Sequence, residues 1–299
     1  MRAYVIGNVT IDETIAVDAL PTSGASILGE IGAHDLGGKG TNQAVVMARC
    51  GVQTTLVAPV GNDVRAAAIR ERLLDEPLIA ELVELEGKSS DVSIIFRLPD
   101  GENAIVTTTG SAQSLTSSDV ASKLQAAEPD DLAILQGNLS HRATREILER
   151  AKALQMVTAF NPSPLRPYFA DLWGLIDVVC LNQGEALALT GTTGEAAAEY
   201  LLQQGLREVV LTLGNKGAIL ANEQAMITVP AHPSVVVDTT GAGDTFMSVA
   251  LASSVKRNCR LDRLAIEHAV KAAAITVSRK GTQSAFPTSQ ELEILLASR

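Results

Sequence analysis

The chain of 299 residues is 46% hydrophobic and 19% charged, so the sequence predicts a folded protein with a sizeable core. Its net charge of −10 at pH 7 argues against sequence-independent nucleic-acid binding, because the phosphate backbone attracts basic surfaces. No apolar run reaches the length of a membrane span, and Asp12 and Glu13 interrupt any apolar leader. We therefore expect a soluble, cytoplasmic protein that binds small molecules, and neither nucleic acid nor membrane.

Short apolar runs alternate along the chain with helical patterns. The runs that read as strands buried on both faces cover residues 3–7, 54–60, 132–136, 157–160, 177–181 and 208–213. Helical patterns cover residues 41–50, 65–76, 142–154 and 194–204. This alternation predicts a mainly parallel sheet flanked by helices, in one α/β domain that spans residues 1–299.

Two segments break this alternation, at about residues 13–37 and 91–110. The second is a hairpin pattern around a Pro-Asp-Gly turn, and the first is strand-like and rich in turn residues. Together they predict a small β-sheet lid that covers a site at the carboxyl ends of the core strands. A merely decorative hairpin remains the alternative.

The three cysteines, Cys50, Cys180 and Cys259, lie far apart in apolar or helical contexts. This spacing favours buried, reduced thiols over a disulfide framework or a zinc site. The four histidines likewise lack the spacing of a metal site.

The stretch DTTGAGDTF, residues 238–246, follows a strand signal at 233–237 and precedes a helical pattern. Glycines at a helix start let a ligand approach free N–H groups, which suits an anion. Asp244 could complement the helix dipole, or it could take a proton from a hydroxyl that attacks a phosphoryl group. The stretch lacks the third glycine of a dinucleotide-binding fingerprint, and the residues around Lys39 do not form a Walker A loop.

Two further stretches favour a polyhydroxylated ligand. Glycines surround Lys39 in residues 35–51, where Asn42 can donate and accept hydrogen bonds, although a plain turn into a packed helix fits as well. Asp12 follows the first strand, at the sheet edge where ligands bind in open α/β folds. It could hold two sugar hydroxyls or be an ordinary loop acid.

These motifs resemble the PfkB (ribokinase-like) carbohydrate kinases, and within that family the ribokinase group most closely. GKGTNQAVVMARCG with the later Gly61 fits the first family signature, and DTTGAGDTF fits the core of the second. FNPSP, CLNQGEALALTG, LTLGNKGA and SRKGTQSAFP follow in the expected order, so the resemblance spans essentially the whole chain.

The resemblance implies a doubly wound ribokinase-like fold whose lid often forms a dimer interface, and it assigns roles by matched position. Asp244 matches the catalytic base, and Gly241, Ala242 and Gly243 match the anion hole with it. The positions that match sugar-binding residues are Thr10, Asp12, Gly38, Lys39, Asn42 and Asn138. The nucleotide side is matched by Asn182, Glu185, Thr212, Gly214 and Gly217, of which Glu185 reaches Mg²⁺ through water. The monovalent-cation loop, which is expected to bind K⁺, is matched by Asp238, Thr240, Thr276, Arg279 and Gly281.

The chain departs from the ribokinase pattern at several of these positions. Thr10 replaces an asparagine and Asn138 a glutamate, and both changes put ribose in doubt as the substrate. Met247 and Val249 are larger than the usual residues after the base. Ala285 replaces a serine near the cation, which predicts weaker K⁺ dependence.

The resemblance implies an ATP-dependent kinase that phosphorylates a hydroxymethyl group of a small unphosphorylated sugar, such as a ribose-like pentose. ATP, Mg²⁺ and K⁺ are its expected cofactors, and a homodimer through the lid its expected assembly. A nucleoside or phosphosugar kinase is the alternative within the family, disfavoured because Phe96 is the one aromatic in the lid segments and only His141 and Arg142 add cations near Asn138. A non-catalytic sugar-binding regulator is the alternative outside it.

Overall fold

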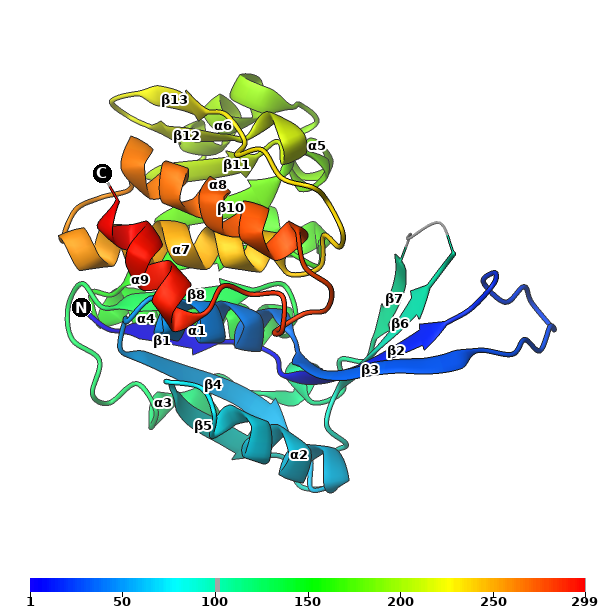
Figure 1. The fold of residues 1–299 in the computed structure, drawn as a ribbon. Coiled ribbons are helices and arrows are strands. Elements are labelled where there is room, and N and C mark those ends of the chain that lie inside the picture. Colours follow the sequence, from blue (N-terminus) through cyan, green and yellow to red (C-terminus); the bar gives the residue numbers. More distant parts are fainter. Residues whose placement is uncertain (100–102, 299) are drawn as a thin grey trace.

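The computed structural model describes residues 1–99 and 103–298, whose largest element is a nine-stranded sheet (Figure 1). Its strands, in spatial order, are β13 (Met226–Val229), β12 (Ala218–Asn222), β11 (Glu208–Thr212), β10 (Val178–Asn182), β9 (Val157–Asn161), β8 (Leu132–Gln136), β1 (Ala3–Ile6), β4 (Thr54–Val60) and β5 (Ile79–Glu84). Neighbours from β11 to β5 pair in parallel, whereas β12 and β13 pair antiparallel at one edge. The chain order reverses between β8 and β1, so a ligand site is expected outside the carboxyl ends of these two strands.

Helices cover both faces of this sheet and bury an apolar core against each (Figure 1). One face carries α1 (Lys39–Arg49), α2 (Val64–Leu73), α7 (Ala242–Arg257), α8 (Arg263–Val277) and α9 (Ser289–Ala297). The other carries α3 (Ser117–Ala121), α4 (His141–Ala153), α5 (Gln183–Thr190) and α6 (Gly194–Gln203), with 3-10 helices η1 (Ala112–Ser114), η2 (Pro167–Leu175) and η3 (Gly214–Lys216) in the connections. α7 packs between α1 and α8, which fixes its first turn at the carboxyl edge of the sheet.

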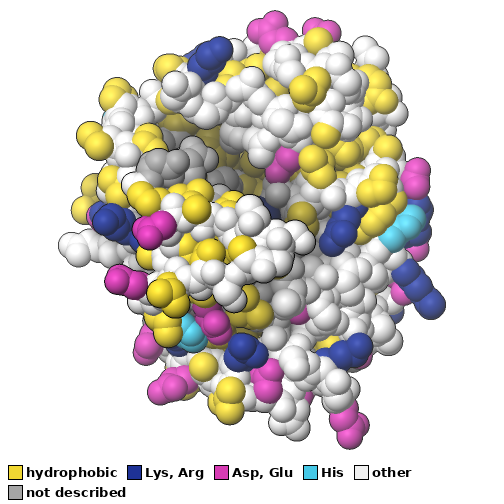
Figure 2. Space-filling model, turned by 90° about the vertical axis from the view of Figure 1, so that its right-hand side faces the viewer, with side chains coloured by type: hydrophobic (Ala, Val, Ile, Leu, Met, Phe, Trp, Pro, Cys, Tyr) yellow, Lys and Arg dark blue, Asp and Glu magenta, His cyan; other side chains and the backbone are white. Residues whose placement is uncertain are grey.

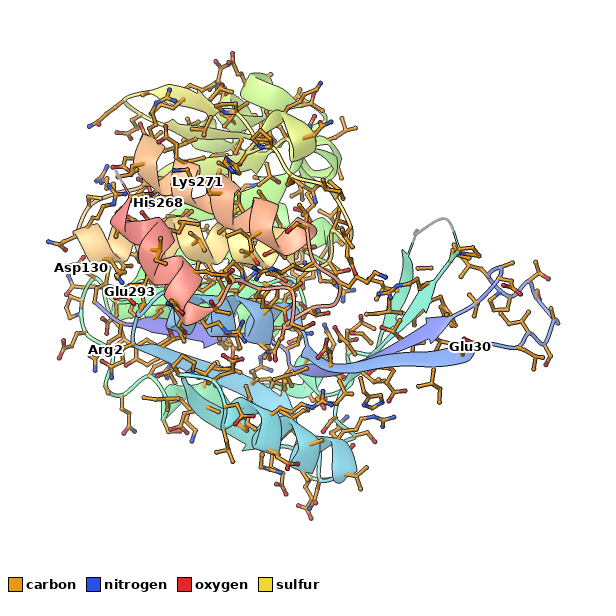
Figure 3. All side chains as sticks on the ribbon, viewed as in Figure 1. Arg2, Glu30, Asp130, His268, Lys271 and Glu293 are labelled. Carbon is orange, nitrogen blue, oxygen red and sulfur yellow. The ribbon has the colours of Figure 1, made fainter. Side chains whose placement is uncertain are left out.

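A separate four-stranded sheet projects from this edge (Figure 1). We call it the small sheet; its spatial order is β3 (Glu30–Gly37), β2 (Thr10–Ala16), β6 (Val92–Arg97) and β7 (Asn103–Thr107). Strands β2 and β6 pair in parallel, with Asp12 opposite Ser93 and Ala16 opposite Arg97. In Figure 3 the labelled Glu30 lies toward the outer end of the small sheet, at the opposite end of the molecule from Arg2 and Asp130.

The predicted core strands and helices are all present, within a few residues at their ends. The strand predicted at residues 233–237 is wrong: the segment has no strand structure, and Val235 is 79% exposed. Its β-branched run borders a cleft instead of entering a sheet. The prediction of buried thiols is also wrong for Cys259, which is exposed. Residues 100 and 101, the Asp-Gly of the predicted Pro-Asp-Gly turn, lie outside the described residues.

Within residues 1–99 and 103–298, no helix is long and apolar enough to cross a membrane.

Candidate active site

A cleft of about 1040 Å³ opens between the large sheet and the small sheet. Asn8 and Asn138 line it from just beyond β1 and β8, where the reversal of strand order predicts a ligand site. The small sheet closes one side with Ser93, Ile95 and Ile105. We call it the main cleft; Figure 2 views this end of the molecule and shows its surface hollowed beside the small sheet.

A second cleft of about 520 Å³, the side cleft, lies next to the main cleft. It is more apolar, with α8 supplying one wall and the turn around Gly214 and Gly217 another. Val236 and Thr239 border both clefts. Thr212, Gly214 and Gly217, which match the nucleotide side of the family pattern, all line the side cleft.

The first residues of α7 form the wall between the two clefts. Gly241 and Asp244 border the main cleft, whereas Ala242 and Gly243 border the side cleft. Gly241 precedes the helix with φ 74°, and a Cβ there would overlap the ring of Phe286, so the position requires glycine. A Cβ on Gly243 would meet no atom within 4 Å.

This helix start can bind an anion. The first N–H groups of a helix have no acceptor inside the helix, and the helix dipole places positive charge there. No side chain caps α7, so no side-chain oxygen competes for those groups. The sequence prediction of an anion site over residues 241–244 therefore fits the observed backbone.

Asp244 is 4% exposed, and two amides from α1 hold its carboxylate. Asn42 donates from Nδ2 to Oδ2 at 3.0 Å, and Gln43 donates from Nε2 to Oδ1 at 2.9 Å. Gln136, at the end of β8, donates to Oε1 of Gln43 at 2.8 Å, which fixes the amide orientation of Gln43. Lys39 places Nζ 4.0 Å from Oδ1 of Asp244. Sequence reasoning missed both glutamines, although Gln43 directly follows Asn42.

Asp12 lies across the main cleft, 6% exposed, and accepts hydroxyl donors. Thr10 donates to Oδ1 at 2.7 Å, and Thr282 donates to Oδ2 at 3.3 Å. Burial raises the pKa of Asp12, and the hydroxyl bonds from Thr10, Ser93 and Thr282 partly oppose that rise. A Cβ on Gly37 would overlap the carboxylate, so this glycine lets Asp12 lie against the backbone of β3.

Thr10 does not line the main cleft, contrary to its predicted place among the sugar-binding residues. Its side chain is fully buried, and its hydroxyl donates to Asp12 instead of facing the cleft. Thr282, which the sequence prediction omitted, does line the cleft. Thr282 belongs to the SRKGTQSAFP stretch, which matches the family pattern, so the sequence could have predicted its place at the site.

Two amide oxygens at the main cleft lack a donor. Oδ1 of Asn42 and Oδ1 of Asn138 are buried, and neither has a hydrogen-bond partner among the described residues. Both residues line the cleft together with Gly38 and Lys39. Because buried acceptors are normally paired, these oxygens favour a ligand that brings hydroxyl donors.

Asn182 and Glu185 form a capping box at the start of α5 and line neither cleft. Asn182 Oδ1 accepts the backbone N–H of Glu185, and Glu185 Oε2 accepts that of Asn182, both at 2.9 Å. Burial raises the pKa of the nearby Cys180 thiol, and the negative charges of Glu185 and Asp244 raise it further.

The residues matched to a monovalent-cation loop are only partly brought together. Asp238 Oδ1 accepts the N–H of Thr240 at 3.0 Å, and its Oδ2 lies 3.5 Å from the backbone nitrogen of Gly281. Thr276 instead donates its hydroxyl inside the helix layer, to Thr245 Oγ1 at 3.0 Å. The Arg279 side chain pairs with Glu291 of α9 at 2.5 Å.

The cations near Asn138 differ from the sequence prediction. Arg142 is exposed and pairs with Glu146, while His141 stacks on Tyr168 at 4.2 Å between ring centroids. Neither lines the main cleft, but Arg166 does. Arg166 follows FNPSP, and sequence reasoning missed it because it lies 28 positions beyond Asn138.

A direct comparison of sequences identifies the family of this chain. The profile described as pfkB family carbohydrate kinase matches residues 2–289. The chain belongs to this family. The PfkB chain is therefore a carbohydrate kinase, a phosphotransferase with an alcohol group as acceptor.

Curated relatives of this PfkB chain include ribokinases. It is 31% identical to mouse (Mus musculus) ribokinase, over 98% of the chain and 94% of the mouse protein. It is 30% identical to a bifunctional ribokinase/ribose-5-phosphate isomerase A of Fructilactobacillus sanfranciscensis, over 97% of the chain. The chain spans 55% of that bifunctional protein.

Among solved structures, the ribokinase of Thermotoga maritima superimposes with a TM-score of 0.90 at 26% identity, covering 100% of both chains. The predicted ribokinase-like α/β fold, with a mainly parallel sheet, flanking helices and a small separate sheet, is confirmed.

Proposed function

We propose that this PfkB kinase transfers the γ-phosphoryl group of ATP to a hydroxymethyl group of a small unphosphorylated sugar, such as a ribose-like pentose. One observation carries the proposal: the anion-binding start of α7 separates an apolar side cleft from a main cleft lined by polar groups. A nucleotide in the side cleft can reach Ala242 and Gly243, while a sugar in the main cleft can reach Gly241 and Asp244.

The sugar is held by groups of the main cleft. Asp12 accepts two of its hydroxyls, and the unpaired amide oxygens of Asn42 and Asn138 accept others. Gly38 and Lys39 border the same space. The small sheet acts as a lid of this single domain, and it excludes water so that phosphoryl transfer to the sugar is favoured over hydrolysis.

ATP is placed with its base against the apolar wall of α8 and its phosphates toward the start of α7. Bound Mg²⁺ would neutralise part of the triphosphate charge. Glu185 is proposed to reach the water shell of that ion, because α5, which carries it, begins directly after the carboxyl end of β10. Asn182 orients Glu185 through the capping box.

Asp244 is the proposed general base. Asn42 and Gln43 fix both of its oxygens, so it can accept the proton of the attacking hydroxyl without first changing rotamer. The N–H groups of residues 241–244 then bind the negative charge of the phosphoryl group in flight.

An ADP-release assay with Mg²⁺ and ATP over pentoses, 2-deoxyribose, hexoses and nucleosides tests the acceptor. Turnover should be highest on a free pentose. Absence of acceptor-dependent ADP release across the whole panel would contradict the proposal.

Replacing the base separates a kinase from a sugar-binding regulator. In Asp244→Asn, turnover should fall by about 10²–10⁴-fold, the usual contribution of a positioned base, while acceptor binding persists. A variant that keeps wild-type turnover would exclude Asp244 as the base. Ser284→Ala is a matched control, because among the described residues its hydroxyl bonds the Lys280 carbonyl of its own loop and no other group.

Arg166 favours a second candidate, a phosphosugar kinase. Its Nε lies 3.4 Å from the Gly137 carbonyl oxygen, and the side chain borders the main cleft, where it could pair with an acceptor phosphate. Adding ribose 5-phosphate and fructose 6-phosphate to the panel tests this. Higher kcat/KM on either than on its unphosphorylated sugar would favour this candidate, and Arg166→Gln should then abolish the preference.

We also propose that the kinase assembles as a homodimer through the small sheet. Strand β3 exposes Ile31 and the segment just before it exposes Leu28, which are 88% and 96% accessible. An interface would remove these apolar side chains from water.

A further inference from the structure

A basic side chain of the small sheet reaches the core beside the start of α7. Alternation along β6 places Ser93, Ile95 and Arg97 on one face of the strand, and the first two line the main cleft. Arg97 is the last residue of β6 and therefore the outermost member of this cleft-facing row. Its Nη2 lies 3.6 Å from Oδ2 of Asp238, across the gap between the small sheet and the core.

Asp238 is a carboxylate that requires a positive partner. Its side chain is 7% exposed, and it is fixed against the loop that continues into Gly241 through the N–H of Thr240. Removing a carboxylate from water is unfavourable unless the charge is paired. A phosphoryl group bound at residues 241–244 adds further negative charge only three positions away, so the need for a cation increases during the reaction.

Family resemblance implies a monovalent cation for this place, but the residues present do not fit one. Oδ2 of Asp238 faces the Arg97 guanidinium at 3.6 Å and the Gly281 nitrogen at 3.5 Å, and both of these groups are donors. A metal cation there would need oxygen ligands and would be repelled by the guanidinium.

We propose that Arg97 is the resident cation of this loop and replaces the monovalent ion. It is a positioning residue: by neutralising Asp238 it orders the segment that leads into Gly241. Because a strand of the small sheet carries it, the guanidinium reaches Asp238 only when the small sheet lies over the main cleft. The charge of Asp238, beside the proposed anion site at the start of α7, is then neutralised only when the small sheet covers the sugar. This inference rests on the proposed function for the binding of phosphate at the start of α7. The ion pair between Arg97 and Asp238 does not depend on that function.

The chain offers a matched control for the test. Arg65 of α2 also pairs with the small sheet, with Nη2 3.6 Å from Oε1 of Glu13 on β2. Its side chain is 39% exposed, compared with 36% for Arg97. Arg65→Val thus removes an equivalent ion pair between the core and the small sheet without touching Asp238.

The experiment measures kcat and KM on D-ribose for the wild type, R97V, R97K and R65V. Each is assayed in KCl and in tetramethylammonium chloride at equal ionic strength. We expect wild-type kcat to differ less than twofold between the two salts. The kcat of R97V should be at least tenfold lower in tetramethylammonium chloride than in KCl. The kcat of R97K should differ less between the two salts, and that of R65V should differ as little as that of the wild type. Tenfold stimulation of the wild type by KCl, or wild-type kcat in R97V without KCl, would overturn the proposal.

A second readout needs no acceptor. The Tm of each protein is measured in the two salts without nucleotide or sugar. KCl should raise the Tm of R97V alone, since only that variant leaves Asp238 without its cation. A KCl-dependent rise of equal size in the wild type would show an ion already bound there and would refute the inference. If the wild type does not phosphorylate D-ribose, the proposed acceptor fails, while this thermal comparison still decides the role of Arg97.

Discussion

At the scale of single residues, the main cleft depends on two carboxylates that are held in different ways. Two amide groups from α1, those of Asn42 and Gln43, donate to Asp244, whereas hydroxyl groups of Thr10 and Thr282 donate to Asp12. Amides and hydroxyls support a carboxylate without neutralising it. Both acids can therefore remain available to a sugar.

The raised pKa of Asp12 predicts how sugar binding depends on pH. Burial makes Asp12 take up a proton at a higher pH than its ordinary 3.8. Only the ionised form accepts two sugar hydroxyls, so affinity for the acceptor selected by the panel should fall as the pH drops toward this raised pKa. Calorimetric titration of the sugar between pH 4.5 and 8 measures the effect without chemistry.

Thr282 provides the test of cause. Its hydroxyl bond lowers the pKa of Asp12, so Thr282→Val should move the acid limb of sugar binding to higher pH. Ser284→Ala, in the same loop, should leave the limb in place. An acid limb at the ordinary pKa of aspartate, or equal shifts in both variants, would contradict this account.

At the scale of elements, the start of α7 uses its two glycines for different purposes. Gly241 has a left-handed backbone against the Phe286 ring, whereas Gly243 faces open space in the side cleft. The fold therefore requires glycine at position 241, whereas we expect the glycine at position 243 to leave room for the proposed phosphate.

Alanine substitutions should separate these purposes. Gly241→Ala should lower the free energy of unfolding by about 1–2 kcal/mol for the left-handed backbone, and by about 1–3 kcal/mol more for the overlap with Phe286. Gly243→Ala should keep or increase that free energy by up to about 1 kcal/mol, because alanine favours the helix, yet should reduce turnover by blocking phosphate. Urea unfolding and the ADP-release assay measure both. Equal losses of stability in the two variants would refute the distinction.

The elements also show how far the sequence could be read. Buried parallel strands are continuous apolar runs, so their positions were predictable. The glycine turn at residues 241–243 likewise predicted the start of α7. The strand predicted at 233–237 failed because β-branched residues also line clefts. The support of Asp244 was harder to predict: Gln136, which donates to Gln43 and so holds that amide in place, lies 108 positions from Asp244, and nothing local marks a glutamine at a strand end as part of this network.

At the scale of the whole molecule, apolar side chains remain exposed on the small sheet (Figure 2). The family pattern was sufficient to predict the small sheet. It could not predict the contact between Arg97 and Asp238, because that pair joins residues 141 positions apart on different sheets.

A dimer through the small sheet can be tested by changing its exposed residues. The wild type should have twice the chain mass of 31.3 kDa in solution, since burial of Leu28 and Ile31 favours association. Leu28→Asp together with Ile31→Asp should shift it to the single-chain mass, because association would then desolvate two charges. Light scattering coupled to gel filtration measures the mass. Leu74→Asp, at an 83% exposed site on the core, is the control, and dissociation in this variant alone would place the interface elsewhere.

The pairing of β2 with β6 has a mechanical consequence. Asp12, the proposed sugar ligand, and Ala16, which lies opposite Arg97, belong to the same seven-residue strand. The ladder of β2 with β6 therefore links the position of Asp12 to that of Arg97, and it stays in register between them although the pairing of β2 with β3 shifts between Glu13 and Ile15. Under the proposed function, substitutions in this strand should therefore alter sugar affinity and the contact between Arg97 and Asp238 together.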